Sequence, residues 1–299
     1  MTSDNPFEPV EKAPEFQSAA RPTVAPKPGE PEAWQPLTFG GVARFARAHI
    51  GRIYLMQILF AVISGGVCIW FFTTAWTPVV EEAIRQLPDQ GALNQGVLKW
   101  GGHSPVRLAA SAHVSLAVDL DAAIPDAEVG DWVFVFSRKE VLASSIFGVF
   151  AAPYPGQWTF PVNRPAVDPW WGAHKPFILA GIGAAMALGL LVSWTLMSLI
   201  HAPVVRLGAF ILDRKLSMSG AWRMAMMALM PGSLWVCASL ILYETRTLDF
   251  IGFLAAYILH FIVGWVYVTG ALYNLPSSIS SADANPFDDA ASPPSEQDL

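Results

Sequence analysis

The sequence predicts an α-helical integral membrane protein with four transmembrane helices and a small β-rich (α+β) exported domain between helices 1 and 2. The 299-residue chain is 53% hydrophobic and 14% charged, whereas soluble domains carry about 25% charged residues. Four stretches without Asp, Glu, Lys or Arg each supply the roughly 20 helical residues that crossing a bilayer requires. These predicted spans are 53–76, 176–200, 224–243 and 250–273. The more polar segment 77–175 separates the first span from the other three.

The two ends of the chain lack the periodic apolar residues that a folded element needs. Residues 1–36 are rich in Pro, Ala, Glu and Ser, and residues 274–299 are rich in Ser, Ala, Asp and Pro. Segments of this composition bury too little apolar surface to fold alone. We therefore expect a disordered cytoplasmic arm at 1–36 and a disordered acidic cytoplasmic tail at 274–299.

An amphipathic interfacial helix is predicted over 37–52, directly before the first span. Its apolar stripe consists of Phe39, Val42, Ala43, Ala46 and Ile50. Arg44 and Arg52 lie on the opposite side, and Phe45 falls outside the stripe. A helix with one apolar and one basic side is typical of the membrane interface. A second interfacial helix is predicted after Pro203, in the loop 201–223.

Patterns of period two predict strands within the segment 77–175, after an opening helix over 77–87 that stops at Pro88. From Val114 to Leu120, apolar and polar residues alternate as in a half-buried strand. Further strands are expected at 132–136, 141–145 and 147–151, separated by turn residues that include Gly and Pro. A segment of this length can hold its own core.

Basic residues predict the orientation, because Lys and Arg gather in short cytoplasmic loops. Two basic groups flank the spans: Arg44, Arg47 and Arg52 before the first, and Arg206, Arg214, Lys215 and Arg223 between the second and third. We therefore expect both termini and the loop 201–223 in the cytoplasm. The layout favours a bacterial inner (cytoplasmic) membrane. The first span begins too far from the N-terminus to be a cleaved signal peptide.

Small residues predict one helix-packing face. Gly181, Ala185 and Gly189 recur every four residues in the second span, and such a face lets another helix approach closely. Pro231-Gly232 predicts a kink in the third span.

Charge, cysteines and motifs exclude several classes of function. A net charge of −6 argues against a nucleic-acid partner, since phosphate binding needs a basic surface. Cys68 and Cys237 both fall within predicted spans, so no disulfide is expected in the exported segment. The chain has no nucleotide-binding, serine-hydrolase or zinc-protease motif. We expect no cofactor, no metal and no enzymatic activity.

His260 is the sharpest candidate for a functional residue. Ten residues into the fourth span, at about 1.5 Å per residue, it lies near the bilayer midplane. An ionisable side chain at that depth is by default a functional hypothesis, here a proton relay or a ligand. The alternative is a neutral imidazole bonded to a neighbouring helix, for instance to Ser193 or Ser239.

Other polar candidates are weaker. Five carboxylates lie close together in sequence: Asp119, Asp121, Asp126, Glu128 and Asp131. Carboxylates attract hard cations, but the order matches no calcium loop and favours a solvated turn. Three histidines lie in the exported segment, His103, His113 and His174, at spacings that match no zinc signature.

The sequence Asn-Pro-Phe occurs twice, near opposite ends of the chain. One copy is Asn5-Pro6-Phe7 and the other is Asn285-Pro286-Phe287. Asn-Pro favours a tight turn that presents the following aromatic ring, so a linear motif is one interpretation. In this respect the tails resemble those of secretory carrier membrane proteins, whose tripeptide docks into EH domains. Those proteins have four spans but lack a large exported domain after the first.

The overall layout resembles a group of bacterial multi-pass inner-membrane proteins that is loosely YIP-like. The resemblance covers about residues 40–273. It depends on Thr77-Pro78, Leu87-Pro88, Gly96-x-Leu98 and Leu116-x-Val118-Asp119, followed by three closing helices. The resemblance implies no activity.

The sequence thus favours a non-enzymatic envelope scaffold or accessory protein. Its expected partners are the lipid bilayer and, through the exported domain, a membrane or envelope protein or a ligand. One alternative is a transporter or permease component that uses His260. A second is a membrane enzyme that acts on lipid or cell-wall precursors.

Overall fold

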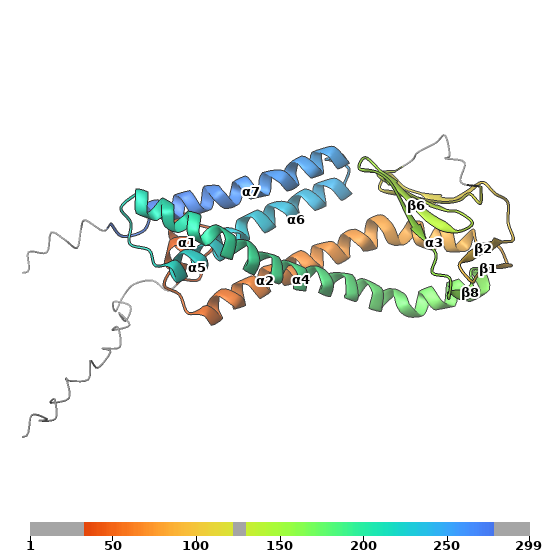
Figure 1. Ribbon diagram of the computed structural model, residues 1–299, viewed down its shortest axis with the longest axis horizontal. Coiled ribbons are helices and arrows are strands. Elements are labelled where there is room, and N and C mark those ends of the chain that lie inside the picture. The colour runs from red at the N-terminus through yellow and green to blue at the C-terminus, as the bar shows by residue number, and fades with distance from the viewer. Residues whose placement is uncertain (1–32, 122–129, 278–299) are drawn as a thin grey trace, which may run out of the picture. The chain divides into compact units, whose positions relative to one another are not determined.

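The computed structural model describes residues 33–121 and 130–277 (Figure 1). Within these ranges, four helical segments are long and apolar enough to cross a membrane: Ile50–Arg85, Arg164–Ile211, Met218–Glu244 and Phe250–Tyr273. A β-sheet region lies between the first two in sequence, so the coarse fold class is confirmed. Most of the predicted arm and tail, and both Asn-Pro-Phe motifs, lie outside the described residues.

The first helical segment continues beyond its predicted span. It consists of α2 (Ile50–Phe71), the π-helical turn η1 (Phe72–Trp76) and α3 (Thr77–Arg85). Pro78, in the first turn of α3, has no N–H to donate to the preceding turn. A π turn at this point, in which the Thr77 hydroxyl donates to the Phe72 carbonyl at 3.0 Å, carries the chain past the proline.

Helix α4 (Arg164–Ile211) has 48 residues, far more than the predicted span 176–200. Asn163 caps its N-terminus, since the Asn163 side chain accepts from the Ala166 N–H. The separate interfacial helix predicted after Pro203 is wrong, because α4 runs through this proline. Three residues around Pro203 are buried: Ala202 directly before it, and Val205 and Ala209 after it. Packing against neighbouring helices therefore maintains α4 although the proline removes one backbone hydrogen bond.

The single surface helix predicted for 37–52 is also wrong. Instead, α1 (Phe39–Phe45) and α2 are separate helices, capped by Thr38 and His49. Helix α1 packs against α5 (Met218–Ala228) and α7 (Phe250–Tyr273), and both Val42 and Phe45 are fully buried. Phe45, which fell outside the apolar stripe, is buried because α1 has neighbours on more than one side.

A methionine core is formed by buried side chains of α1, α5 and the start of α6 (Met230–Glu244). It consists of Val42, Phe45, Met224, Met226, Met227 and Met230, all fully buried. Helix α5 (Met218–Ala228) ends just before α6 (Met230–Glu244) begins, with Pro231 in the first turn of α6. The predicted span 224–243 is therefore divided between two helices, next to the predicted kink. Methionine side chains adapt well to such irregular junctions.

The strands form a three-stranded sheet of order β2-β1-β8 and a five-stranded sheet of order β3-β4-β5-β6-β7. Their bounds are β1 (Gly91–Asn94), β2 (Val97–Trp100), β3 (Val106–Ala110), β4 (Val114–Val118), β5 (Trp132–Phe136), β6 (Glu140–Ser145), β7 (Gly148–Pro153) and β8 (Thr159–Pro161). Neighbouring strands are antiparallel except for β4 and β5, which are parallel. The predicted strand 132–136 coincides with β5.

Helix α3 supports both sheets. Val79 and Ala83 of α3 are buried in one cluster with Leu93, Leu98 and Val114 from the strands. A salt bridge of 2.8 Å between Glu81 and Lys175 also joins α3 to α4. Because α3 continues directly from α2, the strands are attached to the first apolar helix without a flexible linker (Figure 1).

Candidate functional site

The ends of three helices meet the five-stranded sheet at an aromatic cluster. Phe71 comes from the end of α2, Tyr243 from the end of α6, and Phe250 from the start of α7 (Phe250–Tyr273). The ring of Tyr243 lies 5.8 Å from that of Phe71 and 5.9 Å from that of Phe250. Trp132, the first residue of β5, contacts Phe250 at 6.5 Å.

Polar groups of the sheet lie against this cluster. The Tyr243 hydroxyl donates to Oδ2 of Asp131 at 2.5 Å, and Nδ1 of His113 lies 3.6 Å from the same oxygen. The His113 ring packs edge-on against Tyr243 with centroids 4.6 Å apart, and His113 is buried. We call these residues, Phe71, His113, Asp131, Tyr243 and Phe250, the outer junction.

The parallel pairing of β4 and β5 explains why His113 and Asp131 are neighbours. The register pairs Val114 with Trp132, so the residues just before them lie side by side at the same end of two adjacent strands. Two backbone hydrogen bonds fix this end: Asp131 N–H donates to Ala112 O, and Trp132 N–H donates to His113 O, each at 3.0 Å. The sheet therefore presents an imidazole and a carboxylate together to Tyr243.

The outer junction is suited to holding the sheet on the helices. A phenol and an imidazole meet one carboxylate, while aromatic rings close off the other sides. A hydrogen bond to a charged acceptor is stronger than one between neutral groups. Within the described residues, no group of three His, Cys, Asp or Glu side chains is arranged to hold a metal ion.

The acidic residues 119–131 do not gather into one site. Asp119 follows β4 and Asp131 precedes β5, so the parallel strands place these residues at opposite ends of the sheet. Asp119 is buried and accepts from the Asp121 N–H at 3.1 Å, and Asp121 lies 3.5 Å from Arg138. Asp126 and Glu128 lie outside the described residues.

The three histidines of the segment 77–175 lie in different surroundings. His113 belongs to the outer junction, whereas His174 stacks on Trp170 within α4, with ring centroids 4.7 Å apart. The backbone carbonyl of His103 accepts from the Trp100 indole at 2.9 Å. Of these three histidines, only His113 has a carboxylate beside it among the contacts described here.

His260 interacts with its own helix. Its Nδ1 contacts the Tyr257 carbonyl in α7, and its ring packs against Phe261 at 3.9 Å. Ser239, one of the expected partners, donates instead to the Trp235 carbonyl. A Cβ added to Gly232 would lie 2.9 Å from the His260 carbonyl, so α6 and α7 approach closely here.

No described residue covers the predicted small-residue face of α4. Gly181, Ala185 and Gly189 are exposed, and a Cβ added to either glycine would meet nothing within 4 Å. Close packing of α2 on α4 occurs instead at Gly65 and Gly183, where a Cβ on Gly65 would lie 2.9 Å from the Gly183 carbonyl. Contact of the open face with a helix of another chain stays a prediction.

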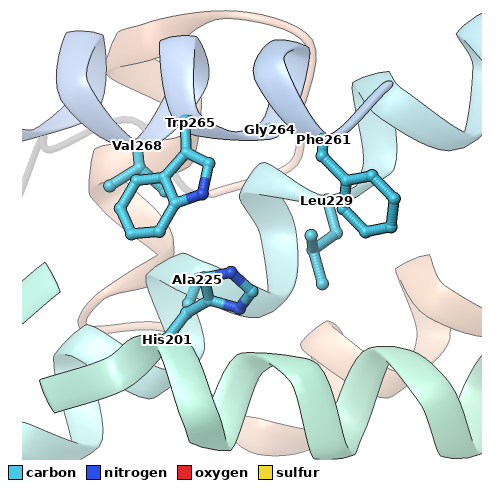
Figure 2. A pocket seen from close by; sticks show the side chains of 7 residues that line it. All are labelled: His201, Ala225, Leu229, Phe261, Gly264, Trp265 and Val268. Atoms are coloured by element: carbon cyan, nitrogen blue, oxygen red, sulfur yellow. The ribbon is translucent and has the colours of Figure 1, made fainter. Parts of the chain in front are cut away.

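Sequence reasoning missed two polar residues in the helices. His201 lines a cavity of about 20 Å³ with Trp265 and Phe261 of α7, and its ring centroid lies 5.1 Å from that of Trp265 (Figure 2). The sequence did not single out His201 as a candidate, because it directly follows the end of the predicted span at residue 200. Gln57 in α2 is fully buried, and neither polar atom of its amide has a hydrogen-bond partner among the described residues. A lone Gln in an apolar run was the available signal.

The thiols of the two cysteines are buried in the helices. Cys237 of α6 donates to the Ser64 hydroxyl of α2 at 3.4 Å, and Cys68 lies one turn beyond Ser64. These contacts place both cysteines at the α2–α6 packing surface, where thiols behave as small apolar groups.

The chain matches no family model, no curated protein and no solved structure. The resemblance to YIP-like inner-membrane proteins therefore stays a prediction. The functional argument depends on the residues of this chain and on their geometry.

Proposed function

We propose that this protein is a non-enzymatic scaffold of the bacterial inner membrane, which displays its sheets on the outer face to bind an envelope partner. Four apolar helices of sufficient length support membrane insertion. The basic residues around the start of α2, and those between residues 200 and 224, support cytoplasmic termini. The sheets then lie on the opposite side, in the cell envelope.

One observation carries the binding proposal: β7 is an open edge strand. It is the last strand in the order β3-β4-β5-β6-β7, and all six of its residues are exposed. Val149 and Phe150 are 60% and 55% exposed. The opposite edge, β3, packs against α3. An uncovered edge offers backbone N–H and C=O groups to an added strand, so it supports binding of an extended, largely apolar peptide segment.

The attachment of the sheets to the helices also supports the proposal that the protein is a scaffold. Helix α3 holds the sheets from one side through Val79 and Ala83, and Tyr243 holds the five-stranded sheet through Asp131. Because the sheet is attached to the helices at two places, its edge strand β7 keeps a defined position relative to them. Such pre-organisation lowers the entropy cost of binding.

The binding proposal is tested by placing a charge on β7. Ala151→Lys in the tagged full-length protein should reduce recovery of a co-purifying envelope protein at least tenfold, because a lysine on an edge strand opposes strand addition. Gln157→Lys adds the same charge at an exposed position outside the strands and should leave recovery unchanged. Equal recovery of the partner with both variants would contradict the proposal.

The orientation is tested separately by thiol labelling, in intact cells for the outer face and in inside-out membrane vesicles for the inner face. Cysteines introduced at Ser104 and Ser217 should react with an impermeant reagent from outside and from inside, respectively. The native thiols of Cys68 and Cys237 are buried and are replaced by Ala as a precaution. The reverse labelling pattern would overturn the orientation.

A further inference from the structure

The turn between β6 and β7 is formed by large apolar side chains. Ile146 and Phe147 are 58% and 57% exposed, and Val149 next to the turn is 60% exposed. Turns that face water favour Gly, Asn, Asp, Pro and Ser instead. No charged residue or histidine occurs from 141 to 163. A contiguous exposed apolar patch marks contact with another surface, either protein or membrane.

The position of this turn favours the membrane. Phe147 packs edge-on against Phe250 with ring centroids 6.1 Å apart, and Trp132 contacts both rings, at 6.4 Å and 6.5 Å. Phe250 is the first residue of α7, which Asp249 caps through the Gly252 N–H. The turn is therefore level with the beginning of an apolar helix.

Helix length places that level at the edge of the hydrocarbon. The 24 residues of α7 extend about 36 Å at about 1.5 Å per residue, slightly more than the about 30 Å of a hydrocarbon core. Both ends of α7 therefore reach the interfacial layers of a bilayer that it crosses. Ile251, which follows Phe250, is 66% exposed, so the start of α7 also presents an apolar side chain to its surroundings.

We propose that the β6–β7 turn inserts Ile146 and Phe147 into the outer interfacial layer of the bilayer, with lipid as its partner. The inference rests on the membrane topology of the proposed function. Aromatic side chains are favoured at this layer, and insertion removes the apolar turn from water. The sheet then has a lipid contact beside the outer junction, while the rest of β7 stays available for a protein partner.

Spin labelling of the full-length protein in lipid vesicles tests this insertion. Single cysteines at Ile146, Ile251 and Gln157, in a chain with Cys68→Ala and Cys237→Ala, carry the nitroxide. Oxygen concentrates in lipid and nickel chelates stay in water, so the ratio of their collision rates reports depth. The label at Ile146 should give a ratio close to that at Ile251 and several-fold above that at Gln157. A label at Val149 provides a second position if the Ile146 variant folds poorly.

Two results would overturn the inference. A water-like ratio at Ile146, equal to that at Gln157, means that the turn is not in lipid. Protection from both oxygen and nickel means that protein covers the turn, and spin–spin broadening would identify a second copy of the chain. Thiol labelling at Ser104 separates this failure from failure of the topology: external labelling together with a water-like Ile146 rejects the insertion alone.

Discussion

The methionine core and the outer junction both hold helices together, but by different means. The methionine core consists of fully buried apolar side chains from three helices, α1, α5 and α6. The polar contacts of the outer junction depend on one carboxylate, that of Asp131. The Asp131 side chain is 24% exposed to solvent. Packing distributed over many atoms tolerates small changes, whereas a junction built on one acceptor responds to the loss of a single hydroxyl. The methionine core and the outer junction therefore differ in their expected sensitivity to a single substitution.

The largest effect is expected from Phe45→Ala in the methionine core. Deleting a fully buried aromatic ring leaves a cavity and should lower the free energy of unfolding by about 3–5 kcal/mol. Phe210→Ala is the matched control, because Phe210 is 78% exposed. Thermal unfolding in detergent measures both variants. Similar melting temperatures for the two would mean that α1 contributes little to the frame.

The next effect concerns the α2–α4 contact between the two regions. Gly65→Leu should lower stability by about 1–3 kcal/mol or more, since overpacking strains a close contact and the neighbouring atom is the Gly183 carbonyl. At the adjacent Gly66, a Cβ would meet nothing within 4 Å. Gly66→Leu should therefore unfold at or above the temperature of the parent protein. A larger loss at Gly66 than at Gly65 would contradict the packing described above.

The substitution Tyr243→Phe tests how much the single hydroxyl contributes to the outer junction. The ring contacts with Phe71 and Phe250 stay, but the hydroxyl that donates to Asp131 is lost. A hydrogen bond to a charged group contributes about 1.5–3 kcal/mol, so we expect a smaller loss of stability than for Phe45→Ala. Hydrogen exchange should accelerate at the start of β5 and not in α5. Tyr273→Phe, at a position 59% exposed, is the control, and equal exchange in both variants would show that the hydroxyl does not hold the sheet.

The smallest effect is expected at high pH, in the strands. Burial, aided by the nearby Glu140, raises the pKa of Tyr154 from 10.0 to about 12. The folded state therefore retains this proton longer than the unfolded chain does. The resulting stability is fully present below pH 10 and is lost as pH rises towards 12. Tyr154→Phe should show a shallower decline in strand stability over pH 10–12. Identical slopes for parent and variant would contradict the role of this group.

The sequence predicted the elements whose pattern is local. Strand β5 was predicted at its observed bounds because apolar and aromatic residues crowd five positions between turn residues. Helix α7 was predicted at its bounds because the 24 residues between Asp249 and Asn274 include no Asp, Glu, Lys or Arg and are mostly apolar. The extent of α4 was not predicted, because prolines at 169, 176 and 203 suggest boundaries that packing overrides.

The outer junction could not be predicted from sequence. The sequence favours a solvated turn for Asp131, and nothing in it predicts that His113 contacts Asp131. Their proximity depends on the parallel pairing of β4 with β5, which no local pattern encodes. The third partner, Tyr243, lies 112 residues from Asp131 in sequence. The close packing of α4 was likewise expected at Gly181 but occurs at Gly183, because the orientation of a helix depends on its neighbours.

The contact between Tyr243 and Asp131 also has a consequence for the order in which parts of the protein fold during synthesis. Every strand of both sheets precedes α4 in the chain, whereas α6, which carries Tyr243, is synthesised after α4. During synthesis we therefore expect the strands to emerge and fold while α6 is still unmade. Helix α3 also precedes the strands in the chain, and its Val79 and Ala83 belong to the apolar cluster of the sheets, so this support is present before α6 is made. Arrival of α6 and α7 would complete the assembly, so premature termination before residue 243 should leave a folded sheet without its final attachment.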